Sequence, residues 1–165
     1  MSHPTYFLKT YGCQMNEYDS LKMANLLTTH LSMQPVSTPE YADLIIVNTC
    51  SIREKAEQTV RKRLEYFNSL KKGHSHRTVG VLGCMAERIS KKILEESSAS
   101  FVCGPDAYRS LPDLIESTSS SSSQKAANIQ LSLEETYADI QPVRKASSTE
   151  AFVSIMRGCN NMCSY

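Results

Sequence analysis

Between Asp43 and Asn48 the chain reads Leu-Ile-Ile-Val, and no polar residue alternates with these aliphatic ones. A strand with one face in water alternates polar and apolar side chains, whereas a strand that is buried on both faces is continuously apolar. The run therefore predicts a strand inside a parallel sheet that helices cover on both faces.

The segments around this strand alternate between strand-like and helix-like patterns. Further strands are expected over residues 6–11, 78–82 and 101–102, with a short extended piece between Pro35 and Pro39. Helices are expected over 17–31 with Asn16 as the cap, for about twenty residues after Cys50, over 86–96, and over 107–116 despite Pro112. Joined by short connections, this order predicts an α/β fold built on a doubly wound parallel sheet.

The compact part of the chain is expected to end near residue 116. Residues 117–123 are serine apart from Thr118, and such a stretch is typical of a linker, which we expect to continue irregularly to residue 150. Residues 151–156 again have the pattern of a strand, and we interpret them as the first strand of a second domain. The predicted organisation is a domain at 1–116, a linker at 117–150 and the start of another domain at 151–165.

Charge and hydropathy exclude some classes of partner. The 18 basic and 17 acidic residues leave a formal charge of +1, so binding to nucleic acid would need a local patch. The longest aliphatic run is too short to cross a bilayer, and no membrane partner is expected. Met1 leads into a strand-like run without a signal peptide, so the protein is expected inside the cell with its six cysteines reduced.

Three cysteines follow predicted strands at the point where a helix begins. They are Cys13, Cys50 and Cys84. In an open parallel sheet such positions lie along one edge, where ligands bind, so the three thiols could share a ligand. An iron–sulfur cluster accepts dispersed thiolates, and three of them leave one iron open. The alternatives are a structural zinc, or cysteines that serve as small buried hydrophobic residues, the interpretation that we favour for Cys103.

A fourth and a fifth candidate ligand lie close together near the end of the sequence. Cys159 and Cys163 form a C-x₃-C pair after Gly158. This spacing alone is a weak signal, because one half of a zinc site would look the same.

One stretch of the chain is locally basic. Between Arg53 and Arg77 there are eight Lys or Arg residues and three Glu residues. The simple interpretation is a solvated helix face. The functional alternative is contact with a nucleic-acid backbone, for which Arg61, Lys62 and Arg63 are the candidate residues.

Three motifs, in this order and at these intervals, resemble the N-terminal domain of the radical-SAM methylthiotransferases. They are Thr10-Tyr11-Gly12-Cys13-Gln14-Met15-Asn16, Asn48-Thr49-Cys50 and Leu82-Gly83-Cys84-Met85-Ala86. Residues 155–165 resemble the beginning of that family's C-x₃-C-x₂-C loop. Residues 50–57 and 133–139 resemble the subgroup that modifies tRNA bearing an isopentenyl adenosine, including its eukaryotic, mostly mitochondrial branch.

The resemblance implies a Rossmann-like domain followed by a partial β/α barrel, and two [4Fe–4S] clusters. Cys13, Cys50 and Cys84 would hold the auxiliary cluster, and Cys159 and Cys163 would be ligands of the second. With an electron donor, the second cluster would cleave S-adenosylmethionine to a 5′-deoxyadenosyl radical. The radical would attack C2 of the isopentenyl adenosine next to the anticodon of a tRNA, and a methylthio group would come from the auxiliary cluster.

The sequence also departs from the family pattern. The third cysteine of the loop would be residue 166, whereas the sequence ends at Tyr165. The barrel and the RNA-binding domain of the family would follow later still. We therefore expect this chain to bind the auxiliary cluster at most, with no catalytic residue of its own and no turnover.

A function of another class is a protein-binding module without redox chemistry. The eukaryotic branch is also named for association with a regulatory subunit of a cyclin-dependent kinase, so such a subunit is an alternative partner. The expected location is mitochondrial by resemblance, with the cytoplasm as the alternative. Uptake of iron by Cys13, Cys50 and Cys84 would favour the enzyme fragment over the module.

Overall fold

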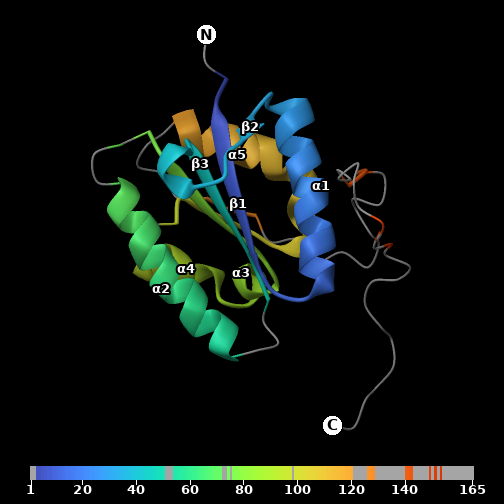
Figure 1. Ribbon diagram of the computed structural model, residues 1–165. Helices are drawn as coiled ribbons and strands as arrows, with labels where there is room; N and C mark the ends of the chain where they lie inside the picture. The colour runs from blue at the N-terminus through green and yellow to red at the C-terminus, as the bar shows by residue number, and fades with distance from the viewer. Residues whose placement is uncertain are drawn as a thin grey trace, which may run out of the picture.

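A computed structural model describes residues 3–50, 54–71, 74, 76–97, 99–120, 126–128, 140–142, 149, 151 and 153. In this part of the chain a sheet of six strands has the order β2-β1-β3-β4-β5-β6 (Figure 1). The strands are β1 (Thr5–Tyr11), β2 (Gln34–Pro35), β3 (Leu44–Thr49), β4 (Thr78–Gly83), β5 (Phe101–Cys103) and β6 (Ala126–Asn128). Each neighbouring pair is parallel, which confirms the predicted sheet.

Helices cover both faces of the sheet. They are α1 (Gln14–His30), α2 (Glu54–Lys71), α3 (Cys84–Arg88), α4 (Ser90–Glu96) and α5 (Leu111–Ser120), with 3₁₀ turns η1 (Pro39–Tyr41) and η2 (Pro105–Ser110). One core cluster joins the sheet to α1 and α5, and a second joins it to α2, α3 and α4. Figure 1 shows α1 and α2 on opposite sides of β1 and β3. The predicted doubly wound α/β architecture is therefore confirmed.

The central strand β3 is buried along its whole length, as its aliphatic run predicts. Leu44 and Ile46 belong to the core cluster of α1 and α5, whereas Ile45 and Val47 belong to the cluster of α2 to α4. Alternate side chains thus enter opposite cores, because successive residues of a strand point to opposite faces.

Two predicted helices differ in detail. The helix expected over 86–96 is divided at Ile89, whose backbone (φ −129°, ψ 34°) is not helical; β-branched residues favour the helix less than straight side chains do. The helix expected over 107–116 begins instead at Leu111, after the 3₁₀ turn η2. Pro112 consequently falls in the first turn of α5, where its missing N–H costs nothing.

The serine-rich stretch begins inside a helix, although a linker was expected from residue 117. The hydroxyl groups of Ser117 and Thr118 donate to the carbonyl oxygen of Leu114, each at 2.9 Å, and Ser119 donates to that of Ile115 at 2.8 Å. With Leu114 and Ile115 anchored in the core, the helix continues to Ser120, and these local bonds satisfy the hydroxyl groups along it. Beyond it, β6 adds an unpredicted parallel strand beside β5.

The chain returns to α1 after β6. Ile140 is buried in the α1 and α5 core, and the side chain of Asn25 donates to the carbonyl oxygen of Gln141 at 2.7 Å. Most of the strand expected over 151–156 lies outside the described residues, and Ala151 and Val153, which are described, belong to no strand. None of the helices in the described part is long and apolar enough to span a membrane.

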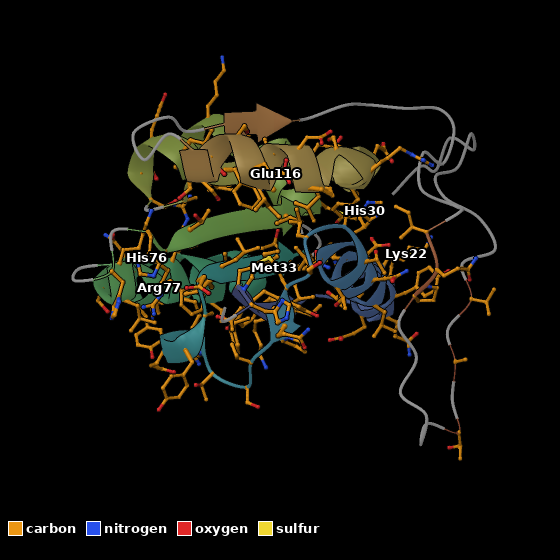
Figure 2. All side chains as sticks on the ribbon, turned by 90° about the horizontal axis from the view of Figure 1, so that it is seen from above. Lys22, His30, Met33, His76, Arg77 and Glu116 are labelled. Atoms are coloured by element: carbon orange, nitrogen blue, oxygen red, sulfur yellow. The ribbon has the colours of Figure 1, made fainter. Side chains whose placement is uncertain are left out.

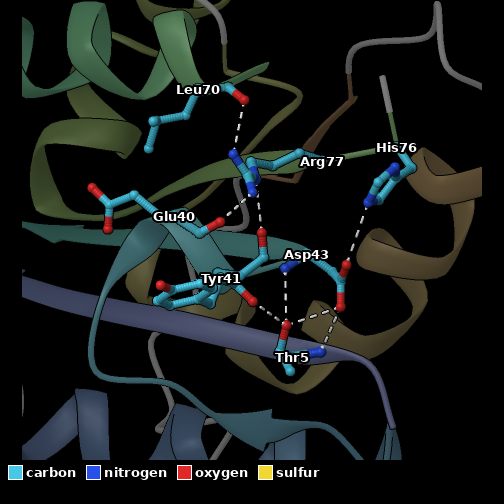
Figure 3. A network of polar contacts seen from close by, with 8 residues as sticks. Thr5, Glu40, Tyr41, Asp43, Leu70, His76 and Arg77 are labelled. Atoms are coloured by element: carbon cyan, nitrogen blue, oxygen red, sulfur yellow. Dashed lines mark hydrogen bonds and ion pairs between the residues drawn. The ribbon is translucent and has the colours of Figure 1, made fainter. Parts of the chain in front are cut away.

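A polar network closes the amino edge of the sheet (Figure 3). The backbone N–H and the hydroxyl group of Thr5 donate to Oδ2 of Asp43 at 2.8 and 2.9 Å. The buried guanidinium of Arg77 donates to the carbonyl oxygens of Glu40, Ala42 and Leu70 at 2.7 to 2.8 Å. These contacts fix the beginnings of β1, β3 and β4 relative to one another.

Candidate metal centre

The three strand-end cysteines lie on neighbouring turns at the carboxyl edge of the sheet. Tyr11, Thr49 and Gly83 pair in one row across β1, β3 and β4. Cys50 and Cys84 directly follow Thr49 and Gly83, and Cys13 follows Tyr11 by two residues. Because adjacent strands are about 4.8 Å apart, all three turns are close neighbours. The predicted placement at one edge is therefore confirmed, while the role of the cysteines as ligands stays a prediction.

The strand order places two of these turns at the switch point of the sheet. The chain passes from β1 to β2 on one side of it, and then to β3 on the other side of β1. The later strands β4, β5 and β6 follow on that second side. Ligands of doubly wound sheets bind outside the carboxyl ends of the strands that flank this reversal. Cys13 leaves the sheet after β1 and Cys50 after β3, so they lie on either side of that position.

The thiols differ in exposure. Cys13 and Cys84 are exposed, and Cys50 is buried; none of the four described cysteines is in a disulfide. Within the described residues, no group of three or more His, Cys, Asp or Glu side chains is gathered as a metal site. The residues nevertheless suit an iron–sulfur cluster by donor type and by the position of their turns, because such clusters take cysteine thiolates from separate segments.

A glycine allows the second and third turns to approach closely. Gly83 has a φ of +95°, a conformation that side chains other than glycine rarely adopt. A Cβ atom at this position would collide with the carbonyl oxygen of Thr49 and lie 2.7 Å from Oδ1 of Asn48. Glycine before Cys84 is thus required by the packing of β4 against β3.

The first turn is held by Asn16, which is not the helix cap that we expected. α1 begins at Gln14 and Cys13 is its N-cap, so Asn16 occupies the third helical position. From there Oδ1 of Asn16 accepts hydrogen bonds from the backbone N–H of Cys13 at 3.1 Å and from its Sγ at 3.3 Å. The helix begins earlier than predicted because this side chain reaches back to the exposed first turn.

A second buried amide, Asn48, continues this contact into β3. Nδ2 of Asn16 donates to Oδ1 of Asn48 at 3.3 Å and to the carbonyl oxygen of Thr49 at 3.1 Å. The sequence analysis named Asn48 only as part of the Asn48-Thr49-Cys50 motif and gave it no role, although a polar residue that ends a continuous aliphatic strand and precedes a cysteine by two was a usable signal.

The remaining cysteines do not add to this group. Cys103 ends β5 but is completely buried, and burial raises the pKa of its thiol to about 12. It stays a neutral thiol in the core, which confirms the interpretation favoured from sequence. Cys159 and Cys163 lie outside the described residues.

The basic stretch does not form one uniform patch. Arg61 forms an ion pair with Glu96 of α4 at 2.9 Å, whereas Lys62 and Arg63 are exposed on α2. Arg77 is buried among backbone carbonyl groups and faces no solvent. Among these residues, Lys62 and Arg63 are therefore the better candidates for contact with phosphate.

A groove at the other end of the sheet is separate from the cysteines. Its volume is about 420 Å³, and Met33, His76 and Glu116 are among the residues that line it. Figure 2, seen from above, shows Met33 between His76 on the α2 side and Lys22 on the α1 side. Because the groove touches Leu44 at the start of β3, it lies a full strand length away from Cys50.

Comparison with known proteins gives one family and a set of named relatives. A family model described as "Uncharacterized protein family UPF0004" matches residues 5–104. The chain is 52% identical over 161 residues to the "tRNA-2-methylthio-N(6)-dimethylallyladenosine synthase" of Amoebophilus asiaticus, covering 96% of this chain and 32% of that protein. It is 50% identical over 165 residues to the human "Mitochondrial tRNA methylthiotransferase CDK5RAP1", covering 96% of this chain and 27% of that protein. The chain thus spans about a third or less of the length of these relatives.

Proposed function

The chain belongs to the protein family UPF0004. From the names of its relatives and the position of its cysteines we propose that it is the part of a tRNA methylthiotransferase that holds the auxiliary [4Fe–4S] cluster. The ligands would be Cys13, Cys50 and Cys84. The observation that supports this most is the row formed by Tyr11, Thr49 and Gly83, since it brings the three cysteine-bearing turns to one edge of the sheet.

The cluster, when bound, would supply the sulfur site from which a methylthio group is transferred to the tRNA. The contribution of the chain is to present three thiols at the carboxyl edge of the sheet, two of them beside the switch point. Cys50 is buried and would approach from beneath, whereas Cys13 and Cys84 are exposed on either side. Within the described residues, the exposure of these two turns leaves the outer side of the site open to a substrate.

The full enzyme of this proposal contains more than the described domain. Cys159 and Cys163 would bind the second [4Fe–4S] cluster together with a further cysteine, and that cluster would use S-adenosylmethionine and an electron donor. The substrate would be the isopentenyl adenosine of a tRNA, as the names of the bacterial relatives indicate. We further propose a mitochondrial location, which the name of the human relative supports.

Anaerobic reconstitution tests this proposal. The purified chain, incubated with Fe²⁺ and sulfide, should take up close to one [4Fe–4S] cluster and show its absorption and its EPR signal after reduction. Replacement of Cys13, Cys50 and Cys84 by Ala should abolish uptake, whereas Cys103→Ala should retain it. Equal uptake by the triple variant, uptake of zinc in preference to iron, or no uptake by the unaltered chain would each contradict the proposal, and the last would favour a protein-binding module.

A further inference from the structure

We propose that Asn16 and Asn48 are positioning residues that lock the three cysteine-bearing turns together for a shared metal group. The inference deepens the proposed function, because it assumes that Cys13, Cys50 and Cys84 act on one ligand. It concerns two amide side chains that would touch neither the metal group nor a substrate.

Asn16 links the first turn to the second. Its Oδ1 accepts from the backbone N–H of Cys13 at 3.1 Å, and its Nδ2 donates at 3.1 Å to the carbonyl oxygen of Thr49, the residue before Cys50. Asn16 is 3% exposed, so water does not compete with either bond. One side chain therefore connects the backbones from which two of the thiols project.

Asn48 is hydrogen-bonded to α1 and lies against the residue before the third turn. Its Nδ2 donates to the carbonyl oxygen of Asn16 at 2.8 Å and to the hydroxyl group of Ser20 at 3.0 Å. Its Oδ1 accepts from Asn16 and packs against Gly83, the residue before Cys84. The hydroxyl group of Thr49 also donates to the carbonyl oxygen of Leu82 at 2.6 Å. This bond joins β3 to β4 at the ends from which Cys50 and Cys84 follow.

Filling the core does not require these amides. The four residues before Asn48 on β3 are aliphatic, and two of them, Leu44 and Ile46, pack in the core cluster that joins α1 to the sheet. Asn48, the next residue of β3, is completely buried. A buried polar group destabilises the fold unless its hydrogen bonds are made. Two amide groups whose hydrogen bonds are all made cost the fold little free energy and permit one arrangement of the segments that they join. Apolar residues in their place would tolerate several such arrangements.

The arrangement also survives the binding of a metal by Cys13. The bond from Sγ to Oδ1 of Asn16 would be lost when the thiol is deprotonated and bound. The bond from the backbone N–H of Cys13 to the same oxygen would remain, since it does not involve sulfur. Asn16 can therefore hold the turn in both the empty and the occupied site, as residues behind metal ligands do elsewhere.

The test uses Cd²⁺ as a probe of thiolate geometry, on the whole chain. Absorption from thiolate-to-Cd²⁺ charge transfer grows with the number of bound thiolates, so it reports coordination separately from activity. Cys159 and Cys163 are replaced by Ser in every sample, because this pair would itself bind Cd²⁺. The otherwise unaltered chain should bind one Cd²⁺ through three thiolates. Asn16→Ala and Asn48→Ala should lose at least one thiolate from this signal and bind Cd²⁺ about 10- to 100-fold more weakly, the usual effect of removing a group behind a metal ligand.

Two control variants separate positioning from stability. Thr10→Val removes the hydroxyl group that lies 2.8 Å from Ser20, so it disturbs the same network without touching a cysteine turn. Asn25→Ala removes an asparagine of α1 whose side chain donates to Gln141, far from the cysteines. Both controls should keep the three-thiolate signal even where thermal unfolding shows lower stability. If an alanine variant does not fold, Asn16→Ser tests the same link, because serine suits a helix start but is too short to reach Thr49.

The possible results distinguish this inference from the proposed function. Folded Asn16 and Asn48 variants that keep the full signal and affinity would overturn the inference and leave the proposed function standing. An unaltered chain that binds Cd²⁺ through fewer than three thiolates would overturn both. A loss of signal in the Thr10→Val control equal to that in the asparagine variants would show that the amides act through stability alone, and this would also overturn the inference.

Discussion

Nδ2 of Asn16 lies 3.1 Å from the carbonyl oxygen of Thr49, although 33 residues separate the two along the chain. The contact joins the turn after β1 to the end of β3, across the switch point of the sheet. It makes the spacing of Cys13 and Cys50 depend on tertiary structure that neither turn could form alone. Substitutions at this edge of the sheet and in the core beneath it should therefore have separable effects on metal binding and on stability.

Cys13→Ala and Cys84→Ala should abolish or strongly reduce iron uptake while leaving the fold intact. Both side chains are exposed, so the expected change in the free energy of unfolding is within about 0.5 kcal/mol for Cys84→Ala. Cys13→Ala also removes the N-cap side chain of α1 and its bond to Asn16, which should cost about 0.5–1 kcal/mol. Urea unfolding and iron analysis of the same preparations check this. A variant that keeps full iron, or one that loses iron because it unfolds, would contradict the expectation.

The thiol of Cys103 should make stability depend on pH in alkaline solution. Its pKa is raised to about 12 in the folded protein because it is buried, whereas the unfolded chain loses this proton from about pH 9 upward. The folded state then holds more protons, so the free energy of unfolding should fall as the pH rises from about 9 toward 12. Comparison with Cys103→Ala, in which this part of the pH dependence should vanish, isolates the effect from other titrating groups.

Alkylation tests independently whether the thiol of Cys103 is buried. At about pH 8 iodoacetamide should modify exposed Cys13 and Cys84 in the native chain and leave Cys103 unmodified, because reaction needs an accessible thiolate. Mass spectrometry of the digested protein locates the adducts. Rapid modification of Cys103 without denaturant would show that the β5 end is not packed as described.

Arg77→Ala should destabilise the fold by about 2–4 kcal/mol, because three backbone carbonyl oxygens lose a charged donor. Arg77→Lys should recover little of this loss, since an ammonium group cannot reproduce the planar set of donors. Urea unfolding measures both variants, with Lys62→Ala as the exposed control on α2. Near-unaltered stability of Arg77→Ala would mean that the network of Figure 3 contributes little.

Gly83→Ala should be destabilising by more than about 1–2 kcal/mol, the usual cost of a left-handed backbone with a side chain. The added Cβ would also meet the carbonyl oxygen of Thr49. Gly104→Ala is the matched control, because its φ of −72° suits any residue. Equal stability of the two variants would argue against a packing requirement at Gly83.

Exchange of Lys62 and Arg63 for Glu should weaken the binding of the chain to tRNA and reduce its dependence on salt. Arg61→Glu should have a smaller effect on tRNA affinity, since its guanidinium already pairs with Glu96. Filter binding at two salt concentrations measures these effects. If all three exchanges leave the affinity and its salt dependence unchanged, α2 is a solvated face and not a contact for tRNA.

Much of the fold was predictable from local patterns. The aliphatic run before Asn48 predicted a strand covered on both faces, because a short segment without polar residues has no side that suits water. The break at Ile89, the helical part of the serine-rich stretch and strand β6 were missed. Strand β6 depends on its pairing with β5, and the extension of α5 on the packing of Leu114 and Ile115 in the core with α1; local patterns specify neither contact.

The sequence by itself determined the order of strands and helices, and it placed a cysteine after each of three strands. These features follow from hydrophobic periodicity and from the position of each residue in its own segment. Only the tertiary structure decided that β1 and β3 are neighbours at a switch point, that Cys103 is a core residue, and that Asn16 and Asn48 bind each other. Hydrogen bonds between segments more than thirty residues apart depend on the packed sheet, and no local pattern specifies them.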